Sequence, residues 1–404
     1  MKLPKVGPAV LVTAAFIGPG TVITASLAGA NYGFALLWAL LFSMVATLIL
    51  QEMACRLGVV TQKGLGENIR EACTNPFLKL IAIGLTVSAI VIGNGAYQSG
   101  NILGASLGLS NLFSDIYITA NISLWPILIG FIAFTVLIKG SYKIIERALM
   151  VLVGLMSIAF IATAVISKPD LGMFFSGLFI PSIPNGATLT VIALIGTTVV
   201  PYNIFLHSSS VSSKWNSPEH LDEARKDLYF AIPLGGLISI AIISTAASAF
   251  FGQKISINNA ADLAPALASI FGDYSSLFIA IGLFSAGISS AITAPLAAAF
   301  ALSGILDLNK SLNSYSFKGI WLSILFIGVI IASLGYKPVS IIWFAQVANG
   351  ILLPLVAIFL LWIMNSKLLG DYKNNKMQNL LSVSVVLVTL LLSGRSLMSA
   401  FGML

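Results

Sequence analysis

Long apolar segments are the feature that most limits what this chain can fold into. Eleven of them follow one another, each close to the roughly 20 residues that a helix needs to cross the hydrocarbon core of a bilayer. Only 9% of the 404 residues are charged, whereas soluble domains carry about 25%. The sequence therefore predicts an all-α polytopic membrane protein with 11 transmembrane helices. The segments are residues 9–30, 34–54, 80–106, 123–140, 146–167, 188–210, 228–251, 275–305, 319–335, 340–364 and 379–400.

The positive charges predict the orientation in the membrane. Most of the 21 lysine and arginine residues lie in loops that share one side, and such loops stay in the cytoplasm. We therefore expect an integral protein of a bacterial plasma membrane with its N-terminus cytoplasmic. An odd number of spans then puts the C-terminus outside. The net charge of +7 comes from these loops, so we expect the lipid bilayer and no nucleic acid as a partner.

Two of the apolar segments are interrupted near their middles, by residues 18–21 (GPGT) and 200–203 (VPYN). A proline inside a helix removes one backbone hydrogen bond and clashes with the preceding turn. In lipid, the freed groups must be buried in protein or line a cavity. Single prolines can also be ordinary kinks, as we expect for Pro295 and Pro354. We therefore expect Pro19, Gly20 and Pro201 to be the residues that break the two helices.

The two interruptions occupy corresponding positions if spans one to five and six to ten are related repeats. Five is an odd number, so such repeats would be inverted across the membrane. Paired broken helices of this kind indicate a transporter with its substrate site near the bilayer midplane. We expect a single transmembrane domain, with repeat one at about 9–167, repeat two at about 188–364 and an extra helix at about 379–400.

The residues around these interruptions resemble the Nramp family of divalent-metal transporters. Residues 18–21 stand where the family has Asp-Pro-Gly-Asn, and residues 200–203 where it has Met-Pro-His-Asn. The resemblance covers nearly the whole chain and implies a LeuT-like fold of two inverted five-span repeats plus an eleventh span. Further matching stretches are residues 28–29 (AG), 32–33 (YG), 36–38 (LLW), 56–61 (RLGVVT), 206–208 (LHS) and 286–290 (AGISS).

The resemblance also implies where a substrate would bind. The family's metal ligands map onto Gly18, Thr21, Val200 and the backbone carbonyl of Thr197, so a carboxylate, an amide and a thioether are replaced here. Without the soft thioether the preference for transition metals is lost. Without a carboxylate, a divalent cation is expected to stay hydrated or weakly ligated. The expected substrate-binding residues are Gly18, Thr21, Thr197, Val200, Tyr202, Asn203 and Gln346.

The family's proton route maps onto neutral residues. The positions of its Asp-x-x-Glu motif in the third span hold Gln98 and Asn101, which share a helix face with Asn94. Amides do not titrate, so the usual proton coupling is not expected. We expect Asn94, Gln98, Asn101 and His207 to line a polar path, while hydrogen bonding between helices remains the alternative for the amides. The neutral candidate lining is completed by Thr24, Thr198, Ser289, Ser290 and Asn349.

Three functions remain open at this point. The first is an Nramp-like secondary transporter that works by alternating access, with a divalent cation as the nominal substrate. The second is a carrier of a neutral or zwitterionic small solute on the same scaffold, and the third is a non-transporting receptor. We expect no enzyme and no cofactor, because the sequence has no metal-ligand cluster and no nucleophile–base pair. It carries no signal for an oligomeric state, and its two cysteines do not suggest a disulfide framework.

Overall fold

The computed structural model describes residues 7–113, 115–119, 122–139, 143–253 and 257–400. Helices dominate, and strands β1 (Tyr117–Thr119) and β2 (Ile122–Ser123) form a small antiparallel hairpin. The helices are α1 (Pro8–Phe16), α2 (Pro19–Tyr32), α3 (Leu37–Thr61), α4 (Leu65–Ala72), α5 (Pro76–Phe113), α6 (Leu124–Lys139), α7 (Lys143–Ile166), α8 (Leu171–Phe179), α9 (Thr188–Thr198), α10 (Pro201–Lys214), α11 (Leu221–Phe250), α12 (Ala268–Phe271), α13 (Ser275–Ile305), α14 (Tyr315–Ser333), α15 (Pro338–Met364) and α16 (Lys376–Ala400), with short 3-10 turns at Pro218–His220, Ala261–Leu267, Gly272–Tyr274 and Lys367–Tyr372.

By length and composition, eight of the described helices can cross a membrane, with α9 and α10 together counted as one of them. A ninth span results if α1 and α2, which are bent by 50° at their junction, are also counted as one. Two shorter apolar helices, Leu124–Lys139 and Met150–Ile166, lie where the fourth and fifth segments were expected. The chain is therefore an all-helical polytopic membrane protein, and the expected count of eleven exceeds this count by those two helices.

The helix boundaries depart from the expected ones mainly at polar ends. The eighth expected segment coincides with α13, but α3 continues to Thr61, beyond the expected end at residue 54. It continues because its polar residues are buried in an ion cluster rather than exposed. Glu52 accepts hydrogen bonds from Arg56 Nη2 at 3.0 Å and from Arg225 Nη2 of α11 at 2.7 Å, and Arg56 Nη2 also donates to Asn374 Oδ1 at 2.7 Å. The cluster ties α3 to α11 and to the segment before α16.

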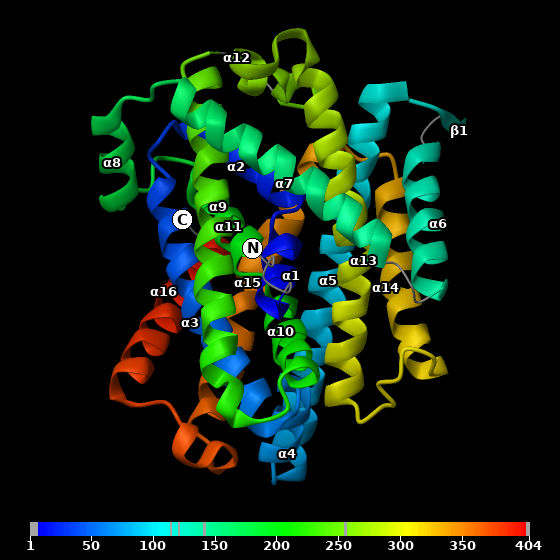
Figure 1. Cartoon of the computed structure of the whole chain (residues 1–404), viewed down its shortest axis with the longest axis vertical. Coiled ribbons are helices and arrows are strands. Elements are labelled where there is room, and N and C mark those ends of the chain that lie inside the picture. The colour runs from blue at the N-terminus through cyan, green and yellow to red at the C-terminus, as the bar shows by residue number, and fades with distance from the viewer. Residues whose placement is uncertain (1–6, 114, 120–121, 140–142, 254–256, 401–404) are drawn as a thin grey trace, which may run out of the picture.

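The short helices of the interrupted spans lie inside the bundle. Figure 1 shows α1, α9, α10 and α15 in its centre, with α3 and α16 towards one edge and α6 and α14 towards the other. The side chains of α9 from Thr190 to Thr198 are buried, as are those of α10 from Pro201 to Ser208. Helices α5 and α13 pack against each other along most of their length. Longer apolar helices therefore separate both interruptions from lipid, which is the condition for breaking a helix at membrane depth.

Candidate functional site

The first interruption lies between α1 and α2. Helix α1 ends at Phe16, Ile17 has φ −83° and ψ 63°, and Gly18 is extended with φ −104° and ψ −175°. Pro19 then starts α2 at its first position, where its missing N–H costs no helical hydrogen bond and its fixed φ suits the helix. The carbonyl end of α1 and the amide end of α2 therefore meet at Ile17 and Gly18.

The second interruption repeats this arrangement. Helix α9 ends at Thr198, Val199 has φ −95° and ψ 73°, and Val200 is extended with φ −80° and ψ 121°. Pro201 then starts α10. Each interruption therefore consists of one residue that closes a helix, one extended residue and a proline that opens the next helix. Gly20, expected to be part of the first break, lies instead within α2.

Two of the expected site residues bring the interruptions together. Thr21 Oγ1 and Thr197 Oγ1 lie 2.8 Å apart and share a hydrogen bond between α2 and α9. Thr21 Oγ1 also donates to the carbonyl oxygen of Phe16, the last residue of α1. One threonine hydroxyl therefore connects both sides of the first interruption to the second.

The space beside Gly18 is occupied by hydroxyl groups. A Cβ atom added to Gly18 would lie 3.1 Å from Ser290 Oγ of α13 and 3.4 Å from Tyr97 Oη of α5. Tyr97 Oη donates to Ala15 O of α1 at 2.9 Å, and Ser290 Oγ is buried without a hydrogen-bond partner. The hydroxyl oxygens of Ser290 and Tyr97, both neutral, therefore lie next to Gly18.

Helix α15 packs closely against α2 and α9 at one glycine of each, Gly20 and Gly196. A Cβ at Gly20 would lie 2.3 Å from Gln346 Nε2, and a Cβ at Gly196 of α9 would lie 2.0 Å from the backbone oxygen of Gln346. Neither position can carry a side chain unless α15 or its glutamine moves. Gln346 Nε2 donates to Ile342 O at 3.3 Å, while Gln346 Oε1 is buried without a partner. This amide oxygen is a free acceptor close to both breaks.

The remaining residues expected at the second break are buried among apolar and aromatic groups. Val200 is fully buried, and both amide atoms of Asn203 lack partners. The ring of Tyr202 lies 5.2 Å from the ring of Tyr97, measured between centroids. Sequence reasoning missed Tyr97 as a site residue. It lies three residues after Asn94 and four before Asn101, so helical spacing along the third span could have found it.

The residues expected to line one polar path face different groups of helices. Asn94 faces α10 and α15, where it lines a small cavity with Tyr202 and Asn349. Gln98 instead faces α13 and α14, because its Nε2 donates to Ala291 O at 2.9 Å and its side chain lies against Gly328. Gln98 therefore makes one of the interhelical hydrogen bonds that the sequence left as an alternative.

His207 lies further along α10. Its Nδ1 is 2.8 Å from Gln51 Oε1 of α3, and since that oxygen can only accept, Nδ1 donates. The side chain is fully buried and Nε2 has no partner. Asn101 is also buried, with its Nδ2 unpartnered.

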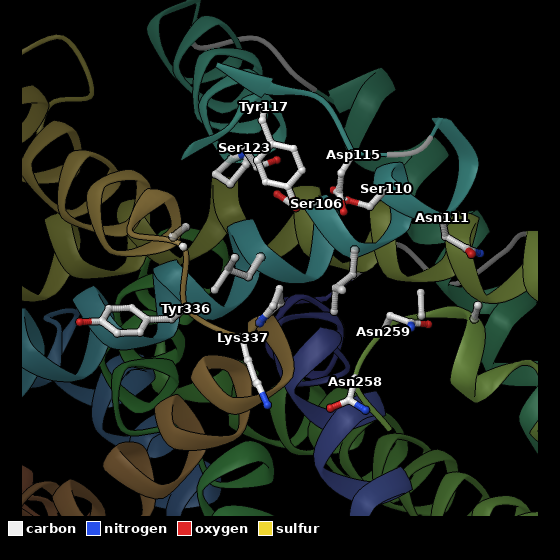
Figure 2. A pocket seen from close by; sticks show the side chains of 18 residues that line it. Ser106, Ser110, Asn111, Asp115, Tyr117, Ser123, Asn258, Asn259, Tyr336 and Lys337 are labelled. Carbon is white, nitrogen blue, oxygen red and sulfur yellow. Dashed lines mark hydrogen bonds between the residues drawn. The ribbon is translucent and has the colours of Figure 1, made fainter. Parts of the chain in front are cut away.

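A large cavity opens at the end of the bundle where α5 ends and α15 begins. Its volume is about 670 Å³. Figure 2 shows Asp115 and Ser110 on one side of this space and Asn258, Asn259 and Lys337 on the other. Its lining continues along α5 to Leu103, whose neighbour Gly104 packs against Pro19. The cavity therefore reaches the level of the first interruption from one face of the protein.

Carboxylates do not gather in the part of the chain that the structure describes. No group of three or more His, Cys, Asp or Glu side chains that could hold a metal ion occurs among those residues. Asp115 lies at the cavity mouth, and Glu52 is engaged by two guanidinium groups. The polar groups around the two interruptions are hydroxyls, amides and backbone carbonyls.

Known proteins resemble this chain over nearly its full length. The sequence model of the family described as "Natural resistance-associated macrophage protein-like" (Nramp) matches residues 9–399. The "Divalent metal cation transporter MntH" of Caldanaerobacter subterraneus subsp. tengcongensis is 28% identical over 402 residues, with 97% of this chain and 92% of the relative covered. The "Metal transporter Nramp6.2" of Populus trichocarpa is 32% identical over 396 residues, with 92% and 70% covered.

Solved structures agree on the fold. The manganese transporter of Eremococcus coleocola superposes with a TM-score of 0.76 at 21% identity, covering 97% of this chain and 86% of that one. MhsT in complex with L-phenylalanine superposes with a TM-score of 0.60 at 18% identity, covering 96% and 98%. These likenesses show a LeuT-like fold, as the family resemblance implied.

Proposed function

This chain belongs to the Nramp family, and from that membership we propose that it is a secondary transporter that carries a divalent metal cation across the membrane by alternating access. Its curated relatives are called divalent metal cation transporters and metal transporters. The family is one of transporters, so the chain is not an enzyme. The proposal extends the metal substrate of the relatives to this chain.

The observation that carries the proposal is the meeting of two interrupted helices through Thr21 and Thr197. Their hydroxyl oxygens lie 2.8 Å apart, between helix ends that leave carbonyl groups without helical partners. Carbonyl groups at broken helices hold cations in transporters. We place the substrate between Gly18, Thr21, Thr197 and Val200, with Tyr202, Asn203 and Gln346 beside it.

The chemistry of this site favours an ion that keeps part of its water shell. A bare dication without a carboxylate partner pays a large desolvation penalty in a low-dielectric interior. Magnesium dehydrates reluctantly and is usually bound with several waters in place. Neutral hydroxyl and amide groups such as Thr21 Oγ1 and Gln346 Oε1 can hydrogen-bond those waters. The proposed substrate is therefore a hydrated or weakly ligated dication.

We further propose that transport runs without the usual proton coupling of the family. The positions of its third-span acids hold Gln98 and Asn101, and that of one histidine holds Tyr202. Neither amide titrates in the physiological range, and Gln98 is engaged with α13. Transport would then follow the metal gradient or the membrane potential.

The proposed topology counts eleven spans in two inverted repeats. It adds α6 and α7 to the eight long helices and to the bent pair α1 and α2. With the N-terminus cytoplasmic, α5 runs outward and ends at the large cavity. This cavity would then be an outer vestibule that leads towards the first interruption.

A second candidate function is a carrier of a neutral or zwitterionic solute. The absence of carboxylates from the described surroundings of both breaks favours it, since such a solute needs hydrogen bonds rather than a counter-charge. MhsT, a structure with L-phenylalanine bound, has the same fold. This candidate predicts solute uptake in vesicles that take up no metal.

Uptake by proteoliposomes tests the proposal. Purified protein is reconstituted with a metal-sensitive dye inside, and manganese, magnesium and calcium are added outside with and without a pH gradient. We expect flux of at least one ion, at a rate that the pH gradient leaves unchanged. No flux of any of the three ions would refute the metal substrate, and a rate that rises with an inward proton gradient would refute the uncoupled mechanism.

A triple change tests where the site lies. Gly18→Asp, Thr21→Asn and Val200→Met together restore the family's ligand types, and the added Cβ at Gly18 requires Ser290 Oγ to give only a few tenths of an ångström. Calorimetry should then show tighter manganese binding than in the unmodified protein. The matched control replaces the aspartate by asparagine, which has the same shape without the charge. Equal manganese binding by both triple variants would contradict the placement.

A further inference from the structure

A groove beside α16 carries polar groups that the proposed transport does not use. It lies between the second half of α16 and the residues that lead into α9, and its volume is about 940 Å³. Helix α16 stands at an edge of the bundle (Figure 1), away from the central helices that hold the two interruptions. The groove is therefore separate from the substrate site.

One part of the groove is polar and holds a positive charge. Arg395 is exposed and forms no ion pair or hydrogen bond with the described residues. The side chains of Asn185 and Thr188 lie in the same lining, and they too form no hydrogen bond within the described part of the chain. No Asp or Glu among the described residues lines the groove. This part therefore suits an anionic group such as a phosphate, to which a guanidinium can donate two parallel hydrogen bonds.

Another part of the groove is apolar. Leu387, Leu390 and Leu391 line it, and all three are exposed. They lie one to two helical turns before Arg395 on α16. Met398, one turn beyond Arg395, is also exposed. The lining thus offers an apolar surface next to its positive charge.

Helix length places these two parts at different depths in the membrane. Arg395 comes nineteen residues after Lys376, the first residue of α16, which corresponds to about 29 Å along a helix. The hydrocarbon core is about 30 Å thick, so Arg395 reaches the headgroup level opposite Lys376. Thr188 marks the same level, because the candidate span Thr188–Lys214 begins there. The leucines then lie about 6–12 Å deeper, at the level of the acyl chains.

We propose that this groove binds one anionic phospholipid of the leaflet in which α16 ends. Arg395 pairs with the phosphate, Asn185 and Thr188 donate hydrogen bonds to the headgroup, and an acyl chain lies along Leu387 and Leu391. A free phosphate would leave the leucines uncovered, so the lipid fits the whole lining. In the proposed topology this is the outer leaflet.

The lipid would connect α16 to the start of α9. The groove has a fixed floor there, since Ser393 Oγ donates to Gly350 O of α15 at 3.1 Å and Leu392 packs against Ile192 of α9. Two glycines, Gly186 and Gly394, leave the lining open. A Cβ added to Gly394 would meet no atom within 4 Å.

Native mass spectrometry of the detergent-purified protein tests the site without any metal. The protein is titrated with phosphatidylglycerol, which is anionic, and with phosphatidylcholine, which is zwitterionic. We expect one phosphatidylglycerol to bind at concentrations at which phosphatidylcholine does not.

Charge variants test the part played by Arg395. Arg395→Gln should raise the half-saturating phosphatidylglycerol concentration about tenfold or more. Arg395→Lys should raise it less, because lysine keeps the charge but loses the paired hydrogen bonds. Lys376→Gln removes an exposed cation from the other end of α16, and as the matched control it should leave the concentration unchanged.

A steric variant tests the groove without changing its charge. Gly394→Leu places a side chain in the groove where no protein atom obstructs it, so it should weaken phosphatidylglycerol binding as strongly as Arg395→Gln. Gly84→Leu is its control, because Gly84 lies in α5 with equally open surroundings. Thermal unfolding without lipid should show both leucine variants folded.

Three results would overturn the lipid site. The first is equal affinity for the two lipids, or phosphatidylglycerol binding that Arg395→Gln leaves unchanged. The second is displacement of phosphatidylglycerol by inorganic phosphate at similar concentration, which would show an anion site without a lipid. The third is a dimer that Gly394→Leu dissociates, which would assign the groove to a second copy of the chain. Lipid binding in a protein without metal flux would remove the proposed function and leave this site standing.

Discussion

Replacing Gly196 by alanine should separate α9 from α15 and destabilise the protein. The new Cβ would lie 2.0 Å from the backbone oxygen of Gln346 and 2.5 Å from the backbone nitrogen of Gly350. Carbon–oxygen contacts need about 3.3 Å, so one helix must shift by about 1 Å. Because the obstacles are helical backbone atoms, no side-chain rotation relieves the clash. Overpacking of this kind costs about 1–3 kcal/mol.

The same exchange also removes a helical glycine, which by itself stabilises a helix by about 1 kcal/mol. Taking the upper end of the overpacking cost, we expect a net loss of about 2 kcal/mol in the free energy of unfolding. Equilibrium unfolding in mixed detergent micelles measures it. Gly84→Ala is the control, because Gly84 lies inside α5 with no atom within 4 Å of the added carbon. It should be neutral or stabilising by up to about 1 kcal/mol. If Gly196→Ala unfolds at the same denaturant concentration as Gly84→Ala, the close approach of the helices is wrong.

Three further predictions concern groups outside the proposed site. Glu52→Gln leaves two guanidinium groups without their counter-charge, and it should lower the free energy of unfolding by about 3 kcal/mol in the same assay. The guanidinium of Arg70 lowers the pKa of the exposed Asp307 carboxyl. The ion pair therefore adds a small amount of stability above the ordinary carboxyl pKa, and this stability is lost as the pH falls through the lowered pKa of Asp307. In an NMR titration, Arg70→Gln should raise the pKa of Asp307 back towards its ordinary value. Burial raises the pKa of the Cys73 thiol, so the rate at which maleimide labels Cys73 should increase as the pH rises above neutrality. Cys55 is fully buried and should stay unlabelled in the folded protein. Intact-mass measurement of the labelled protein checks both expectations.

The polar residues of the third span illustrate where sequence reasoning stopped. Helical spacing placed Asn94, Gln98 and Asn101 on one face, and α5 is indeed continuous there. Helical spacing could not show that different residues of this face contact different neighbouring helices. Asn94 therefore lines a cavity, while Gln98 pairs with the backbone of α13. Which helix contacts which side of a face depends on packing across distant parts of the chain.

The loop after α10 carries a local signal for a helix start, but that signal does not determine how long the helix is. Ser217 and Pro218 predict a helix start, and Ser217 Oγ does accept a hydrogen bond from the N–H of Glu219 at 3.3 Å. A single 3-10 turn leads directly into the 30 residues of α11, because the apolar run beyond the loop continues the same helix into the bundle.

The sequence by itself determined the class of the protein and the location of its interruptions. Uncharged segments of membrane-spanning length can satisfy their backbone only as helices in lipid, and a proline lacks its N–H wherever it stands. Tertiary structure alone decided what surrounds each interruption. Thr21 and Thr197 are 176 positions apart and yet share a hydrogen bond, and Tyr97, Ser290 and Gln346 come from three other helices. Such contacts depend on how helices approach one another, which is set by glycine-mediated packing over the whole bundle and is encoded in no single segment.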